Sequence, residues 1–191
     1  MENQALDGSS SRNSILNAIA VIMLDTDYDK ITVRDVVAEA NVSRSTFYRL
    51  FSSVDEAIGA LEDKYLGLMA EINRIGLMAD MGENSTKRTP SMVLRLELFQ
   101  ANAPAFLALL GPHANPRTRR KEAQLMEAYF QTKRADENLT PEERDLYLRF
   151  VIDGHNSLLH RWLSHYPALP AEDVASLLNE LFYAPLLSRR K

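Results

Sequence analysis

The sequence predicts an all-α fold of about nine helices, because its apolar residues recur at helical spacing and no segment of useful length alternates with a period of two. The 191 residues suffice for one large domain or two small ones with a real core. The absence of cysteine excludes disulfides, thiolate metal sites and a cysteine nucleophile. With a net charge of −4, the chain as a whole does not favour nucleic acid, so any DNA-binding face must be local.

Three short helices are predicted near the N-terminus, after the polar residues 1–10, which we expect to form a flexible end. Apolar residues share one face of the first helix at positions 15, 16, 19, 22 and 23. The segment DTDYDK ends that helix. Thr32 and Asp35 have the spacing of a capping box and begin the second helix, which stops at Asn41. Ser43 then caps the third helix.

A long helix and several shorter ones are predicted in the rest of the chain. Ser53 and Glu56 form a second capping box, which opens a helix from about residue 54 to residue 78. Residues 79–90 are rich in turn formers and are expected to be a linker. Prolines then stand near the expected first turns of helices, where their missing N–H costs nothing. The remaining helices are expected near residues 91–100, 104–110, 117–135, 141–165 and 171–184.

The segment ITVRDVVAEANVSRSTFYRLF, residues 31–51, has the pattern of a helix-turn-helix. The tight turn usually needs a residue in the left-handed conformation, and Asn41 is the best tolerated substitute for glycine there. Phe47 is expected to face the other helices, whereas Arg44 and Arg49 are expected to face outward. Arginine can bind a guanine edge bidentately. The alternative is a helical corner whose polar face is merely solvated.

The stretch ITVRDVVAEANVSRSTFYRLFSSVDEAI closely resembles the N-terminal DNA-binding domain of TetR-family transcriptional regulators. The matching residues lie in the second and third predicted helices and in the turn between them: Thr32, Val37, Ala38, Asn41, Val42, Ser43, Thr46, Phe47, Tyr48 and Phe51. The resemblance covers about residues 11–60. It implies a DNA-binding domain at residues 11–53 and a helical regulatory and dimerisation domain at residues 54–191.

The resemblance also implies that the third helix reads a pseudo-palindromic operator in double-stranded DNA. Arg44 and Ser45 would face bases, whereas Thr46 and Tyr48 would contact phosphate. The candidate DNA-binding residues are Thr32, Ser43, Arg44, Ser45, Thr46, Tyr48 and Arg49.

Three features of this segment depart from the family pattern. Leu50 replaces a common His, and Val54 replaces a common phosphate-binding Lys. Residues 1–51 contain five Lys and Arg against seven Asp and Glu, a net charge of −2. Because phosphate neutralisation dominates affinity for DNA, few released counterions are expected. The alternative function is therefore a TetR-fold protein with a weakened DNA-binding domain, acting mainly through protein–protein contacts.

The last two predicted helices are candidates for a dimer interface. The helix near 171–184 carries a regular apolar stripe, and the helix near 141–165 is apolar over a wide arc, which suggests burial on two sides. The family resemblance implies that this pair meets its counterpart in a homodimer; the alternative is a helix pair internal to one subunit. The candidate interface residues are Phe150, Leu158, Val174, Leu178, Leu181 and Phe182.

A site for an unidentified small-molecule effector is expected by family analogy between the 54–78 helix and those that follow. Its candidate lining residues are Tyr65, Met69, Met92, Phe99, Met126, Tyr129, His155 and Trp162. Met and aromatic residues on an inner face are also what an ordinary core contains. The five-residue spacing of His155, His160 and His165 turns neighbours by about 140° on a helix, so they cannot share one metal ion.

The sequence predicts neither catalysis nor a cofactor. Tyr129 and Lys133 have the spacing of a short-chain dehydrogenase pair, but no Gly-x-Gly occurs in the chain. Residues 15–24 resemble a short signal-peptide core but lack a cleavage site and are too short to span a bilayer. We therefore expect a cytoplasmic protein with no membrane partner, a ligand-responsive DNA-binding regulator, and in particular a repressor released by its effector.

Overall fold

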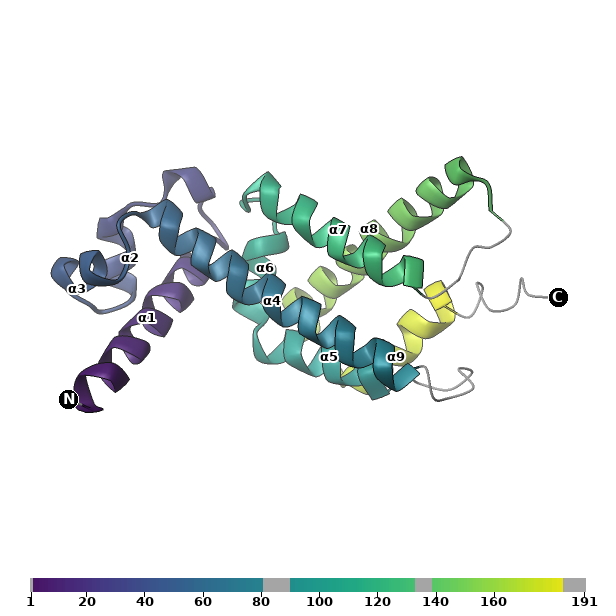
Figure 1. The fold of residues 1–191 in the computed structure, drawn as a ribbon, viewed down its shortest axis with the longest axis horizontal. Coiled ribbons are helices and arrows are strands. Elements are labelled where there is room, and N and C mark those ends of the chain that lie inside the picture. The colour runs from purple at the N-terminus through teal and green to yellow at the C-terminus, as the bar shows by residue number, and fades with distance from the viewer. Residues whose placement is uncertain (1, 81–89, 133–138, 184–191) are drawn as a thin grey trace. The chain divides into compact units, whose positions relative to one another are not determined.

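The computed structural model describes residues 2–80, 90–132 and 139–183, and the regular elements within these ranges are all helical (Figure 1). The predicted all-α class is therefore confirmed for the described part of the chain. The chain divides into two compact units: Met1–Gly67 with Pro104–Arg119, and Leu68–Ala103 with Arg120–Lys191. The chain crosses between these units inside α4, at the start of α6 and inside α7, whereas the sequence suggested a division at residue 53.

The first unit begins with four helices and one 3-10 turn. They are α1 (Glu2–Ile22), η1 (Tyr28–Lys30), α2 (Val33–Glu39), α3 (Arg44–Leu50) and the first part of α4 (Val54–Asp80). Residues 2–10, which the sequence suggested as a flexible end, are helical and belong to α1. The core of this part is apolar and fully buried, and includes Ile15, Ile19, Met23, Val36, Phe47 and Phe51.

Residues 104–119 complete the first unit with most of α6 (Ala103–Leu110) and the start of α7 (Pro116–Thr132). The Tyr65 ring meets the Phe106 ring edge to face, with centroids 4.8 Å apart. The buried Thr118 hydroxyl donates a hydrogen bond to the Glu62 carboxylate. These contacts explain why the first half of α4 belongs with the 104–119 segment.

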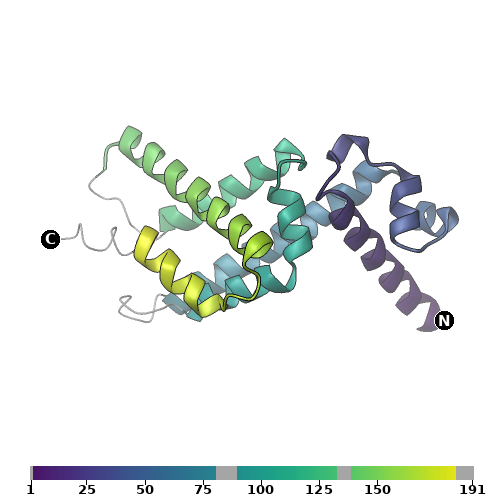
Figure 2. The same cartoon turned by 180° about the vertical axis from the view of Figure 1, so that it is seen from behind.

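The second unit contains the end of α4, α5 (Pro90–Ala101), the remainder of α7, α8 (Pro141–His165), α9 (Ala171–Leu178) and a π-helical turn, η2 (Asn179–Tyr183). Thr140 and Glu143 form a full capping box at the start of α8. The Trp162 indole N–H donates to the Leu169 carbonyl at 3.0 Å, which fixes the loop between α8 and α9. Figure 2 shows α8 in green and α9 in yellow on the near side of this unit.

Two residues predicted at a dimer interface lie instead in the core of the single chain. Val174 and Leu178 are 1% and 0% exposed. Their apolar stripe is used within the subunit, where α9 packs against α5. Leu177 on α9 and Leu181 in the following turn, η2, are exposed and stand four residues apart. The side chains of Tyr129 and Phe182, also predicted site residues, lie outside the described ones.

Among the described residues no single helix is long and apolar enough to cross a membrane, although the segments Met92–Ala101 and Ala103–Leu110 meet that test as a bent pair.

Candidate nucleic-acid interface

The turn between α2 and α3 has the geometry predicted for a helix-turn-helix. Asn41 has φ of 51°, the one positive value found for a non-glycine residue in the described part of the chain. The Val42 N–H bonds the Val37 carbonyl at 3.1 Å, and the Asn41 N–H bonds the Ala38 carbonyl at 3.4 Å. This is the Schellman pattern that closes a helix with a left-handed residue. The expected left-handed residue is thus confirmed, and it sets the angle at which α3 leaves the turn.

Hydroxyl groups hold the first turn of α3. Ser43 is the N-cap, and its Oγ accepts the Thr46 N–H at 3.0 Å. The same Oγ lies 2.9 Å from Thr46 Oγ1 and 2.7 Å from Ser45 Oγ, within hydrogen-bonding distance of both. Ser43 therefore acts first on the helix itself, and it fixes the positions of the two hydroxyls that follow it.

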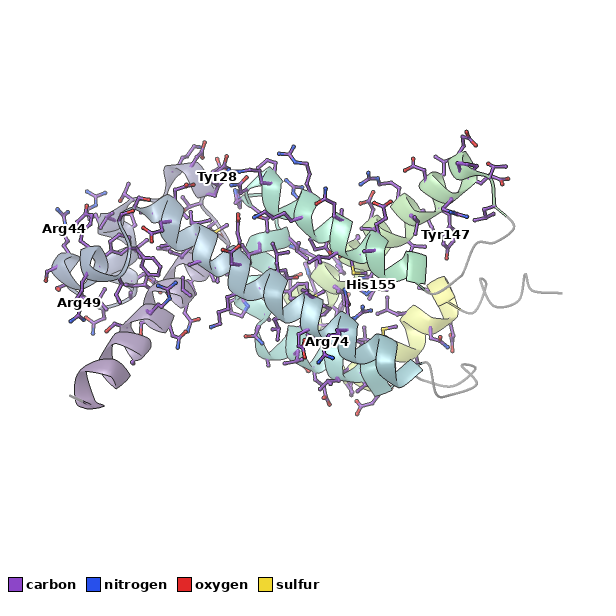
Figure 3. All side chains as sticks on the ribbon, in the orientation of Figure 1. Tyr28, Arg44, Arg49, Arg74, Tyr147 and His155 are labelled. Carbon is purple, nitrogen blue, oxygen red and sulfur yellow. The ribbon has the colours of Figure 1, made fainter. Side chains whose placement is uncertain are left out.

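One face of α3 is buried and the other is open to solvent. Phe47 is fully buried, whereas Arg44, Ser45 and Arg49 are exposed, and Tyr48 is 58% exposed. Figure 3 shows the Arg44 and Arg49 side chains projecting outward from this helix. The exposed face thus carries two guanidinium groups, a phenol and a hydroxyl, which are suited to base edges and phosphates.

Thr32 has a structural task at the start of α2. Its Oγ1 donates to Asp35 Oδ2 at 2.6 Å, and its backbone N–H donates to the same oxygen at 3.1 Å. These bonds lower the pKa of the exposed Asp35 carboxyl below its ordinary value. Thr32 is exposed, so a DNA contact remains compatible with its position, but its hydroxyl proton is already engaged.

The acidic residues that give residues 1–51 a net charge of −2 lie outside α3. The sequence of α3, RSTFYRL, has two arginines and no acidic residue. Asp27, which precedes η1, accepts from Lys30 Nζ at 2.5 Å. The His113 ring, followed by Lys30, lowers the pKa of Asp27 through hydrogen bonds. The net charge of −2 therefore does not prevent a locally cationic recognition face.

Aromatic packing and a modified cap support the end of α3. The Arg12 guanidinium lies over the Phe51 ring, 4.5 Å from its centroid. At the start of α4, Ser53 Oγ accepts the Glu56 N–H at 3.1 Å, as predicted. The Glu56 carboxylate, however, accepts from the Ser52 N–H at 2.7 Å. The reciprocal half of the predicted capping box is thus shifted by one residue, and it ties the segment after α3 to α4.

Sequence reasoning did not find the contact between the η1 region and the loop after α6. His113 Nδ1 lies 2.7 Å from Asp27 Oδ1, and the Tyr28 N–H donates to the His113 carbonyl at 3.0 Å. The two side chains are 86 residues apart in the chain, so no local pattern joins them. Together with the bond between Glu62 and Thr118, this contact fixes residues 111–118 to the N-terminal helices.

Most predicted effector-site residues are buried, but not all belong to one unit. Tyr65 is in the first unit, against Phe106. The remaining described candidates are buried in the second unit: Met69, Met92, Phe99, Met126, His155 and Trp162. Three polar residues that were not predicted, Asn73, Arg95 and Glu122, are buried in the same unit. Arg95 stands in the apolar run MVLRLELF, a signal that could have identified it.

The three histidines of α8 do not form a cluster. His155 is buried, whereas His160 and His165 are exposed. Nor do the described residues contain any group of three His, Asp or Glu side chains placed to hold a metal ion.

Residues 15–59 match the model of the family described as bacterial regulatory proteins, tetR family. This N-terminal segment is thus similar to the helix-turn-helix domain of TetR-family regulators. The matched range spans α2, the Asn41 turn and α3. No curated protein sequence matches the chain.

Several solved structures share the fold over nearly the whole chain. A TetR transcriptional regulator from Streptococcus agalactiae 2603V is 22% identical, with a TM-score of 0.58 over 93% of this chain and 98% of its own. PfmR, a TetR-family regulator from Thermus thermophilus, is 18% identical, with a TM-score of 0.59 over 88% and 92%. A γ-butyrolactone receptor (ArpA-like protein) is 15% identical, with a TM-score of 0.55 over 92% and 98%. The chain thus has a TetR-like all-α fold with an N-terminal helix-turn-helix domain.

Proposed function

We propose that this protein is a homodimeric, ligand-responsive repressor that inserts α3 into the major groove of operator DNA. The observation that carries this proposal is the Asn41 turn, because it presents a helix with two exposed arginines and no acidic residue. Arg44 and Ser45 are assigned to base edges, and Tyr48 to phosphate. Thr46 is half-buried, and with Ser43 and Thr32 it contributes mainly by holding the helix starts.

A second copy of the chain is the proposed partner of α8 and α9. Leu177 and Leu181 form an exposed apolar pair on α9 and its π-helical continuation, and Leu146 and Phe150 form another on α8. Leu158 is half-buried and can contribute from the same helix. Joining two such surfaces about a two-fold axis would supply the two DNA-binding domains that a pseudo-palindromic operator requires. Sedimentation should give a mass of about twice 21.6 kDa; a monomer at micromolar concentration would contradict this proposal.

A small-molecule effector is proposed to bind in the second unit and to release the DNA. The γ-butyrolactone receptor with this fold supports a small-molecule ligand. The chain passes between the units within α4, at the start of α6 and within α7. An effector that binds two conformations of the protein with different affinity can therefore change the position of α3 through these helices. The proposed function involves no catalysis. A cytoplasmic location is proposed with it, because the protein must meet genomic DNA.

The test is a binding assay with labelled promoter DNA from the protein's own locus, with and without excess competitor DNA. The wild type should keep a specific complex in the presence of competitor. Arg44→Ala should lose that complex, whereas Arg119→Ala should keep it, because Arg119 is an exposed arginine outside α3. If wild-type binding is removed by competitor as easily as that of Arg44→Ala, the alternative of a TetR-fold protein acting through protein contacts is favoured. The net charge of −2 for residues 1–51 is the observation behind that alternative.

A further inference from the structure

The second unit contains a buried histidine whose ring is poorly hydrogen-bonded by the described residues. His155 is 1% exposed, and neither ring nitrogen makes a hydrogen bond of ordinary geometry to a described residue. The adjacent Asn156 side chain lies close enough to oppose part of the lowering of the His155 pKa. Figure 3 labels this side chain among the helices of the unit. The neighbouring Asn156 gives its amide N–H to Glu122 at 3.0 Å. Because buried polar atoms are almost always paired, an imidazole left in this condition points to a ligand that supplies the missing partner.

The charged groups near His155 favour a negative partner. Arg95 is 3% exposed, and its guanidinium donates to Asn73 Oδ1 and to Met92 Sδ, both at 3.4 Å. Burial, followed by the positive charge of Arg95, lowers the pKa of His155 to about 3, so the ring is neutral and offers one N–H donor. Burial raises the pKa of Glu122 to about 7, and Arg95 opposes that rise.

Large apolar side chains stand one or two helical turns from each of these polar groups, on the same helix faces. Met69 precedes Asn73 by four residues on α4, and Met126 follows Glu122 by four on α7. On α5, Arg95 lies between Met92 and Phe99, and on α8 Trp162 follows His155 by seven residues; all of these side chains are buried. Methionine is unbranched and adapts its shape readily, so this shell can rearrange around an apolar body.

We propose that the effector is a small amphipathic acid, whose carboxylate is bound by Arg95 and the His155 N–H and whose apolar part lies among the Met, Phe99 and Trp162 side chains. This inference rests on the proposed function, because it specifies the ligand class of the same effector site. An amine would meet the like charge of Arg95, and a neutral amide would forgo the charge-assisted hydrogen bond.

The test uses hexanoate, octanoate and 4-phenylbutyrate, each beside its amide and its amine, with calorimetry on the full-length protein. At least one acid should bind about tenfold or more tightly than its amide, with the amine weaker still. Arg95→Met should abolish this preference and Arg95→Lys should retain part of it. Glu97→Gln is the matched control, because Glu97 is an exposed charged residue on the same helix.

A second readout does not depend on any variant folding. In the wild type, ring-nitrogen NMR signals of His155 should shift when the acid is added, while those of the exposed His160 and His165 should not. Equal binding of acid and amide, an unmoved His155 signal, or no binding by any probe would overturn the inference. Specific operator binding in the promoter assay would still stand in each of these cases, so the two failures can be told apart.

Discussion

Replacing Glu122 by Gln should make the protein more stable at pH 8 than the wild type, by an amount that disappears in acid. Glu122 is buried on α7, and burial raises its pKa from 4.5 to about 7. Between these values the folded protein keeps a proton that the unfolded chain has lost, so stability falls as pH rises. At about 1.4 kcal/mol per pKa unit, ionised Glu122 destabilises the folded state by about 3 kcal/mol above pH 7.

Urea unfolding of both proteins across pH 4 to 8.5 measures this difference. One fixed protein concentration is used, because the proposed dimer would make stability depend on concentration. His155 contributes in the opposite sense, because its lowered pKa makes stability rise with pH between about 3 and 6.5. This contribution cancels when the free energy of unfolding of the wild type is subtracted from that of Glu122→Gln. Glu97→Gln is the control at an exposed glutamate. If the stability difference between Glu122→Gln and wild type were constant over this range, Glu122 would not be buried as described.

Three further changes test other parts of the structure. Asn41→Gly should be tolerated, because glycine adopts the same left-handed conformation, whereas Asn41→Val should lower the free energy of unfolding by about 1–2 kcal/mol or more, as measured in urea. Leu181→Asp should dissociate the proposed dimer and leave the helical circular dichroism intact, because Leu181 is exposed. Leu178→Asp should unfold the chain, because it places a charge in the subunit core. The opposite pattern would contradict an interface that includes Leu181 and excludes Leu178. His113→Ala should let the Asp27 carboxyl titrate at a higher pH than in the wild type, because its main hydrogen bond is lost; an unchanged carboxyl NMR titration would argue against that contact.

Local signals made much of the N-terminal domain predictable. Asn41 and Ser43 act through hydrogen bonds within a few residues, so the turn and the helix start follow from residue type and spacing. The shifted bond from Glu56 to Ser52 shows the limit of this approach, because a neighbouring amide competed for the same carboxylate. A capping pattern predicts a helix start better than it predicts which amide the carboxylate accepts.

Periodicity predicted the helices of the second unit but not their partners. The stripe containing Val174 and Leu178 is equally consistent with an intersubunit seam and with a subunit core, and the structure uses it in the core. Arg95 and Glu122 were not predicted as buried, because charged residues are rarely buried and only tertiary packing brings them together. Contacts between residues distant in the chain, such as Asp27 and His113, leave no periodic signal.

The central claim, that α3 reads DNA bases, is tested most directly by fluorescence anisotropy on an operator and its single-base variants. Two half-sites about one helical turn, ~34–36 Å, apart are expected. Arg44→Ala should lose about 1–3 kcal/mol on the preferred sequence and relax discrimination at one position in each half-site. Tyr48→Phe should instead weaken binding to all sequences alike, because a phosphate contact carries no base information. If Arg44→Ala changed neither affinity nor preference, residues 31–51 would form a helical corner that does not read DNA.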